Sequence, residues 1–169
     1  MTRASRRLPV LSDHRVVLRA AEAGDLPAID AGIHDPDVLR WIGPQPSMPE
    51  EVLARDRERW AHGEPTLVIC EPDGSCVGKV WVGFRGGDTS TGYVGYWLLP
   101  AGRGRGLATS AVRLISSWAR RELGIADLRI TTEPDNAASL RVAERSGFRR
   151  ISASPDEIVL SLEWPSRSE

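Results

Sequence analysis

The chain has 169 residues, a length that suits one domain able to bury a hydrophobic core without a metal ion or a disulfide. Its hydrophobic fraction of 41% and charged fraction of 27% are those of an ordinary globular protein, so neither a disordered nor a membrane-spanning chain is expected. The formal net charge of -1 provides no overall positive field, so we expect no nucleic-acid partner, and any anion must be bound locally.

We expect residues 1–169 to form one domain, because no repeat, low-complexity block or long linker interrupts the chain. The basic start of the chain is not followed by an apolar stretch of signal-peptide or membrane-spanning length. We interpret residues 1–12 as a flexible tail and expect a cytoplasmic location with no membrane partner.

The first half predicts one short strand and two helices. Residues 16–20 have the apolar character of a strand, and Asp25 is a candidate N-cap for a helix that follows at once. Residues 47–50 match a capping box, which predicts a second helix to about Ala61. We expect these helices to cover one face of a sheet.

The middle of the chain changes to the alternating pattern of strands. Residues 66–71, 76–85 and 91–99 predict a three-stranded meander, since each run is bounded by Gly, Asp or Ser turns. Cys70 and Cys76 flank one of these turns and should lie on facing strands. A cross-strand disulfide is one interpretation, and two small thiols in a reducing cytosol are the favoured one.

The strongest predicted element is a helix over residues 107–123, where apolar residues recur along one face. After it we predict a strand over 128–132, a short helix over about 137–146 that Gly147 ends, and two strands near 148–153 and 157–162. The fold class is therefore mixed α+β, with about six to seven strands flanked by helices.

A glycine-rich and arginine-rich segment precedes that long helix. The first turn of a helix exposes unpaired N–H groups and the positive end of the helix dipole, and glycines let a pyrophosphate approach the main chain. Arg103 and Arg105 add charges that phosphate oxygens accept. An ordinary strand-to-helix turn with solvated arginines is the alternative. The pattern of a nucleoside-triphosphate loop is absent, and the glycine spacing does not fit a dinucleotide fingerprint.

This segment resembles the cofactor loop of the GNAT acyltransferase superfamily, whose motif is Arg/Gln-x-x-Gly-x-Gly/Ala. Arg103, Gly106 and Ala108 occupy the three defined positions of that motif. The resemblance is to the RimJ/RimL-like branch, similar to ribosomal-protein alanine acetyltransferases, and it spans most of the chain. Further matches to that branch are Val17-Leu18-Arg19 with Asp25, Gly95-Tyr96-Trp97-Leu98, and the run from Asn136 and Ser139 to Gly147-Phe148.

The resemblance implies a V-splayed mixed sheet with acetyl-CoA, or another acyl-CoA such as succinyl-CoA, between the fourth and fifth strands. It also implies contacts to the cofactor from two regions. Main-chain groups of Leu98 and Leu99 should bind the pantetheine arm, and Asn136 and Ser139 should approach the pantetheine and its sulfur. The pyrophosphate should be bound by the segment Arg103, Gly104, Arg105, Gly106, Leu107, Ala108 and Thr109. Without the resemblance, Asn136 would be a helix N-cap and Ser139 a solvated first-turn serine.

For the chemistry we assign Leu98, Ser139 and Glu133. The N–H of Leu98 would stabilise the charge on the acyl oxygen, and Ser139 would donate a hydrogen bond to the sulfur. Many superfamily members have a Tyr where this chain has Ala143, and a Glu where it has Tyr93. Glu133 is the nearest candidate base in the sequence, although a solvated loop carboxylate is the simpler interpretation.

The missing base favours a protein N-terminus or an amino-acid-like acceptor. An α-amine with a pKa of ~7.7–8.0 is partly neutral at pH 7, whereas a lysine amine near ~10.4 is not. Trp41 and Tyr93 are our candidates for lining the acceptor site. The alternatives are acetylation of a small-molecule amine, such as a polyamine or an antibiotic, and a non-catalytic acyl-CoA-binding sensor. His14, His34 and His62 lack metal-ligand spacing, so no metal is expected, and relatives suggest a homodimer.

Overall fold

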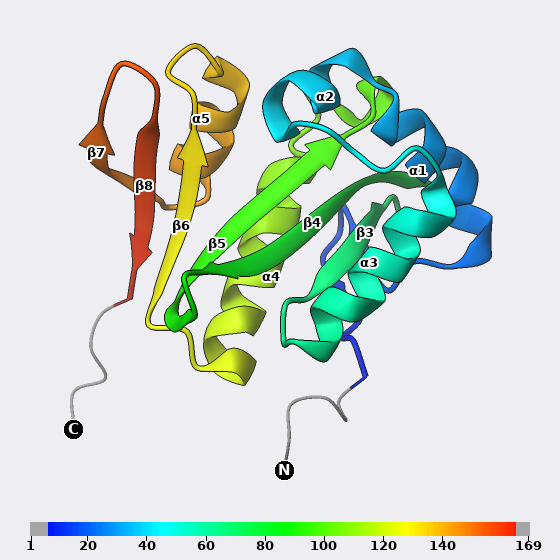
Figure 1. The fold of residues 1–169 in the computed structure, drawn as a ribbon, viewed down its shortest axis with the longest axis horizontal. Coiled ribbons are helices and arrows are strands. Elements are labelled where there is room, and N and C mark those ends of the chain that lie inside the picture. The colour runs from blue at the N-terminus through cyan, green and yellow to red at the C-terminus, as the bar shows by residue number, and fades with distance from the viewer. Residues whose placement is uncertain (1–6, 165–169) are drawn as a thin grey trace.

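The computed structural model describes residues 7–164 as one eight-stranded sheet with helices on both faces (Figure 1). The order across the sheet is β1-β2-β3-β4-β5-β6-β8-β7. The strands are β1 (Leu11–Ser12), β2 (Val17–Arg19), β3 (Thr66–Cys70), β4 (Cys76–Arg85), β5 (Asp88–Leu98), β6 (Asp127–Thr132), β7 (Arg149–Ala153) and β8 (Ile158–Glu163). The helices are α1 (Leu26–Ile33), α2 (Pro36–Ile42), α3 (Pro49–Ala61), α4 (Leu107–Leu123) and α5 (Ala137–Arg145), with short 3-10 turns at Ala23–Asp25 and Pro100–Gly102.

The sheet splits between β5 and β6. These two strands are parallel and pair only over Thr91–Tyr93 and Asp127–Arg129. β5 then continues alongside β4 to Leu98, while β6 remains paired with β8 as far as Thr132. The strands therefore diverge in a V, visible in Figure 1 as the widening gap between the green and yellow arrows. This is the splayed mixed sheet that the resemblance implies.

Two hydrophobic clusters hold the helices on the sheet. The larger one lies between the sheet and α4, whose residues Ala111, Val112, Ile115 and Ala119 are completely buried. The smaller one lies under α1 and α3 on the opposite face and includes Ile29, Val52 and Val68. Among residues 7–164, no helix combines the length and apolar character that crossing a bilayer requires.

The boundaries of α4 agree with the prediction from periodicity. The helix covers residues 107–123, and glycines with positive φ lie at both ends: Gly106 at +77° and Gly124 at +67°. A residue without a Cβ adopts this left-handed conformation at little cost, so the chain can turn sharply into and out of the helix. The turn before α4 directs its first N–H groups toward the opening of the sheet.

Three local predictions differ from the structure. Residues 11–12, expected in the tail, pair with β2 as the additional strand β1, and residues 1–6 lie outside the described residues. The structure also has a helix that was not predicted, α2, which Asp35 caps by accepting bonds from the N–H groups of Asp37 and Val38. Helix α3 begins after Met48 without a side-chain cap, so the capping box expected over residues 47–50 does not form.

Cys70 and Cys76 are partners across the β3–β4 pair, as their flanking of a turn predicted. Both thiols are free. The structure therefore agrees with the interpretation of Cys70 and Cys76 as two separate thiols.

Asp25 makes an ion pair where a helix cap was expected. Its carboxylate accepts two bonds from the Arg19 guanidinium, at 2.7 and 3.0 Å, and one from the Glu22 N–H at 2.8 Å. Burial by itself would raise the pKa of Asp25, but the Arg19 and Glu22 bonds outweigh it and hold the pKa below its ordinary value. The pair fastens β2 to the turn that begins α1.

We predict that Asp25→Asn lowers the free energy of unfolding by about 2–4 kcal/mol at pH 7, because Arg19 then loses its charged partner in a mostly buried place. The folded-state pKa is depressed, so this contribution is complete above the unfolded pKa of ~3.9 and is lost as the pH falls below it. Urea denaturation at pH 7 and pH 3 measures both effects. The exposed Asp30 of α1 provides the control, Asp30→Asn; an equal loss in both variants would contradict the role of the pair.

Candidate functional site

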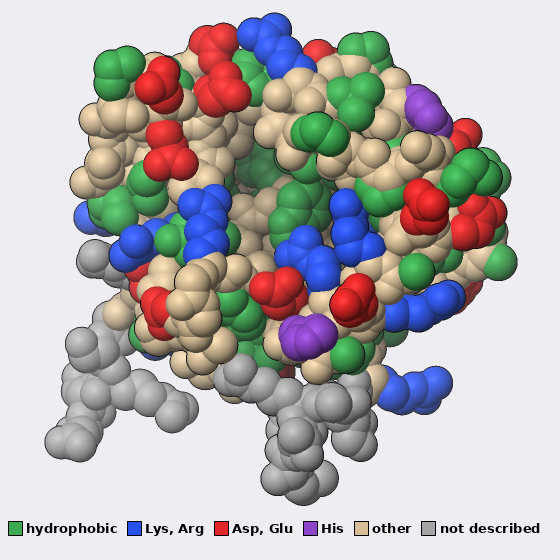
Figure 2. All heavy atoms as spheres, in the orientation of Figure 1, with side chains coloured by type: hydrophobic (Ala, Val, Ile, Leu, Met, Phe, Trp, Pro, Cys, Tyr) green, Lys and Arg blue, Asp and Glu red, His purple; other side chains and the backbone are tan. Residues whose placement is uncertain are grey.

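A cavity of about 520 Å³ occupies the opening of the V. Its walls come from β5, β6, the start of α4, α5, α2 and the loop between β7 and β8. Figure 2 shows a hollow in the middle of the visible face, with Lys and Arg side chains below it and acidic side chains gathered to its upper left. The cavity thus joins elements that lie far apart in the sequence, at the point where the sheet divides.

The turn into α4 presents main-chain donors to this cavity. Gly104 and Gly106 line it and have φ values of +71° and +77°. Within the helix, the first N–H to find an acceptor is that of Ser110, which bonds Gly106 O at 3.2 Å. The preceding N–H groups of the first turn have no helical acceptor, as at any helix start, and they lie beside cavity-lining residues Leu107, Ala108 and Thr109. Together they form a site for an anion such as a pyrophosphate.

Arg103 lines the cavity, but its guanidinium is occupied within the protein. It donates to Asp35 at 2.7 Å, to Asp37 at 2.8 Å, and through Nε to Leu98 O at 3.0 Å. Burial would raise the pKa of Asp35, yet the bond from Arg103 and those from the N–H groups of Val38 and Asp37 hold it below its ordinary value. The Arg103 side chain therefore fastens α2 over the cavity, and its N–H bonds Pro100 O.

Arg105 also differs from the expectation. Its side chain points away from the cavity lining and bonds Glu71 and the carbonyl of Ala101. A cation from another part of the chain, Arg15, lies beside the turn: its Nη1 donates to Arg105 O at 3.2 Å and lies 3.6 Å from the position a Cβ on Gly106 would take. Arg15 is exposed, and within the described residues its guanidinium meets no carboxylate. Ninety positions separate it from the turn, so no sequence motif could indicate it.

The free edge of β5 distinguishes Leu98 from Leu99. Successive residues of a strand direct their N–H and C=O groups to opposite sides. Both groups of Leu99 are occupied, because its N–H bonds Val77 O at 2.8 Å and its C=O accepts from Gly102 at 2.9 Å. By alternation, the N–H of Leu98 faces the opening, and Leu98 lines the cavity. Of the two predicted main-chain contacts, only Leu98 has a group available.

Asn136 and Ser139 both line the cavity at the start of α5. The Asn136 side chain accepts from the Ser139 N–H at 3.1 Å and is therefore a helix N-cap as well. The phenol of Tyr96, which also lines the cavity, lies close to the Ser139 side chain. Burial raises the pKa of Tyr96 to about 12, so this phenol remains protonated at neutral pH. Ala143 is fully buried in the core.

Of the remaining predicted site residues, two line the cavity and one does not. Trp41 and Glu133 line the cavity, and Glu133 is exposed. Tyr93 is not among the lining residues: it lies where β5 and β6 still pair, and the Arg85 guanidinium stacks on its ring at 4.0 Å. In the described part of the chain, no three His, Cys, Asp or Glu side chains are grouped as a metal site would require.

Comparison with known proteins gives one family. Residues 15–149 match the model of the acetyltransferase (GNAT) domain. A curated relative, Probable N-acetyltransferase YjcK of Bacillus subtilis, is 32% identical over 78 residues, which are 46% of this chain and 43% of the relative. The chain thus matches less than half the length of the curated relatives.

Solved structures share the fold over nearly the whole chain. An acetyltransferase from Agrobacterium tumefaciens has a TM-score of 0.77 and 25% identity, covering 94% of this chain and 96% of its own. RimJ of Mycobacterium smegmatis, solved with CoA-disulfide, has a TM-score of 0.77 and 21% identity, covering 91% and 87%. At 21% identity, the likeness to RimJ shows a shared fold.

We predict that Gly106→Ala weakens binding of acetyl-CoA about tenfold or more, because a Cβ strains the left-handed turn that directs the α4 N–H groups. Gly124→Ala is the matched control, since it introduces the same strain at the other end of the same helix. Titration calorimetry on both variants measures the effect. Equal affinities, with equal losses of stability, would contradict the assignment of the turn.

We also predict that Arg15→Gln weakens acetyl-CoA binding about three- to tenfold and makes the affinity less dependent on salt, since a screened cation is removed. The same titration at low and high ionic strength measures both effects. Arg57→Gln, an exposed arginine on α3, should change neither. An unchanged affinity in Arg15→Gln would show that this cation contacts no phosphate.

Proposed function

The chain belongs to the acetyltransferase (GNAT) domain family, and from this premise we propose that it transfers an acyl group, most simply acetyl, from acyl-CoA to a primary amine. The observation that carries the proposal is the cavity at the V, which adjoins both the free edge of β5 and the first turn of α4. An acyl-CoA is a long flexible thioester that requires main-chain partners along its arm, which the β5 edge offers, and an anion site at its other end, which the α4 turn offers.

The residues present fit an acyl-CoA. The N–H groups from Gly104 to Thr109 suit a pyrophosphate, and Arg15 adds the nearby positive charge. The Leu98 N–H at the free edge suits an amide carbonyl of the pantetheine arm or the acyl oxygen. When bound, acyl-CoA supplies an activated acyl group, and the protein supplies position, charge stabilisation and a hydrogen bond to the sulfur.

In the reaction that we propose, the amine nitrogen bonds the acyl carbon and the carbon–sulfur bond breaks. The Leu98 N–H stabilises the charge that develops on the acyl oxygen. Ser139 donates a hydrogen bond toward the departing sulfur, and the Tyr96 phenol beside it can orient that hydroxyl. The thiolate then takes up a proton from water. A thiol pKa of ~8.5 makes this modest assistance sufficient. The amine loses its proton to water or to Glu133 at the rim.

The acceptor that this chemistry favours is an α-amine, on a protein N-terminus or an amino-acid-like molecule. Glu133, Asp156 and Glu157 line one side of the cavity and would attract a cationic amine there. A polyamine or an antibiotic amine would use the same acidic side. We further propose acetyl in preference to succinyl as the donor, a cytoplasmic location, and a homodimer as the assembly.

The proposal is tested by thiol release from acetyl-CoA and succinyl-CoA in the presence of N-terminal peptides, amino acids and polyamines. Amine-dependent release supports acyl transfer and identifies the acceptor class. Tight binding of acetyl-CoA without release by any amine would instead support a sensor.

We predict that Ser139→Ala and Tyr96→Phe each lower kcat about tenfold or more while changing the Kd of acetyl-CoA less than threefold, because they act on the departing sulfur. Since the two hydroxyls act in series, the double variant should lose little more than either single one. Steady-state kinetics with calorimetric Kd values make the test. Wild-type kcat in both single variants would exclude this route.

A further inference from the structure

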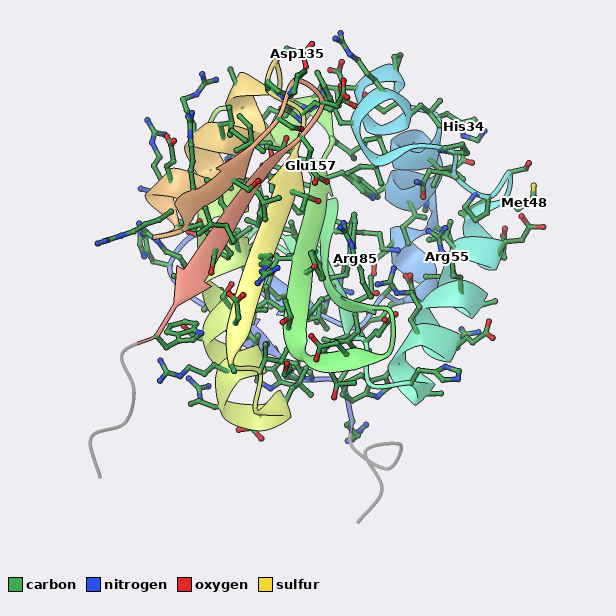
Figure 3. The ribbon with its side chains drawn as sticks, turned by 60° about the vertical axis from the view of Figure 1, so that its left-hand side comes forward. His34, Met48, Arg55, Arg85, Asp135 and Glu157 are labelled. Carbon is green, nitrogen blue, oxygen red and sulfur yellow. The ribbon has the colours of Figure 1, made fainter. Side chains whose placement is uncertain are left out.

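Arg85 extends across the sheet just below the opening of the V. It begins at the end of β4, stacks on the ring of Tyr93 in β5 at 4.0 Å, and donates through Nη2 to Thr131 Oγ1 in β6 at 3.1 Å. Pairing between β5 and β6 ends at Tyr93 and Arg129, and Thr131, two residues further along β6, already lines the cavity. The guanidinium therefore lies at the vertex, on the face of the sheet opposite α4, and contacts the lining directly (Figure 3).

The charge of Arg85 is not neutralised by the groups around it. On the same face, Lys79 is paired with Asp56, Arg59 with Glu64, and Arg129 with Asp127. The residue opposite Arg85 in the β4–β5 hairpin is Asp88, whose carboxylate bonds Ser90 at 2.7 and 2.8 Å. Within residues 7–164, the partners of Arg85 are a ring and a hydroxyl, both neutral. It keeps a full positive charge and unused N–H donors at an exposed position.

A second cation of the same kind lies on α3. Arg55 donates to the side-chain oxygen of Gln45 at 3.1 Å, and its buried Nε has no hydrogen-bond partner. Arg55 lies near Lys79. Burial lowers the pKa of Lys79, and the positive charges of Arg55 and Arg59 lower that pKa further. This side of the hollow therefore has an excess of positive charge, as the basic side chains in Figure 2 illustrate.

The opposite side of the cavity is acidic. Glu133, Asp156 and Glu157 all line it, and Figure 3 shows Glu157 beside the upper part of β6 while Arg85 lies further down. A cationic amine is favoured near the acidic side and disfavoured near Arg85, and a carboxylate has the reverse preference. An acceptor that carries both groups close together would be oriented by this difference, with its amine toward the opening.

We propose that Arg85 binds a carboxylate of the acceptor, so that the preferred acceptors are primary amines with a carboxylate close by: a free amino acid or a peptide N-terminus followed at once by an acidic residue. This proposal rests on the amine acylation proposed above and specifies its substrate class. The stacking on Tyr93 and the bond to Thr131 hold the guanidinium in one orientation before the acceptor arrives, which reduces the entropy lost on binding. A bidentate carboxylate contact can then form with the remaining donors.

The test compares matched acceptors in thiol-release assays with acetyl-CoA. Serine and serinamide differ in one carboxylate, as do peptides that begin Ser-Asp-Gly and Ser-Asn-Gly. We expect kcat/KM to favour the carboxylate member of at least one pair about tenfold or more, and Arg85→Gln to abolish that preference. Comparing the ratio between wild type and variant cancels the different amine pKa values. The amino-acid pair and the peptide pair separately identify the source of the carboxylate.

Arg57→Gln on α3 is the control and should keep the wild-type preference, and Arg85→Gln should leave the Kd of acetyl-CoA unchanged. Turnover with no carboxylate preference, or a preference that survives in Arg85→Gln, would overturn the inference while the proposed function stands. If no amine is turned over, the proposed function fails. Titration of the acetyl-CoA-loaded protein with the two peptides then decides: binding of the Ser-Asp-Gly peptide that requires Arg85 supports the anion site, and equal or no binding of both peptides overturns it.

Discussion

The divergence of β5 and β6 is the constraint on which the rest of the structure depends. Parallel strands normally satisfy one another's main-chain groups along their length, but here pairing stops after Tyr93 and Arg129. Each strand is instead held from its outer side, β5 by β4 and β6 by β8, and both pack on the core beneath α4 and α5. The inner edges remain unpaired, and polar main-chain groups inside a protein require partners. A ligand with amide groups along an extended arm is suited to be that partner.

In the glycine-rich turn, the glycines and the arginines have different roles, which the sequence alone does not distinguish. Its glycines allow the left-handed turn that exposes the first N–H groups of α4, and this is a main-chain property. Its arginines serve the protein itself: Arg103 fastens α2 through Asp35 and Asp37, and Arg105 bonds Glu71. Because Trp41 of α2 lines the cavity, the Arg103 contacts link the glycine-rich turn to a second wall of the cavity.

Periodicity predicted most of the fold. The helix over residues 107–123, the meander and the two final strands follow from local apolar patterns, which do not depend on distant contacts. One error occurred where two local interactions competed: Asp25 bonds Arg19, six residues earlier in the chain, instead of capping α1. The candidate site was predicted less completely. Gly106, Leu98 and Asn136 belong to motifs, whereas the positions of Arg15, of Tyr96 beside Ser139 and of Arg85 depend on contacts between distant segments. Tyr93, a candidate for lining the acceptor site because it lies on a strand facing the early helices, is outside the cavity lining, and its ring lies against the Arg85 guanidinium.

Amide hydrogen exchange with and without acetyl-CoA tests the central claim most directly, since it reports on the main-chain groups assigned to the ligand. The N–H groups at the start of α4 have no helical acceptor, so they should exchange rapidly in the free protein. We predict that acetyl-CoA slows exchange over residues 104–109 and at the free edge of β5 near Leu98, and leaves α3 unchanged. Protection elsewhere, or none in these two segments, would contradict the claim that the V between β5 and β6 is the acyl-CoA site.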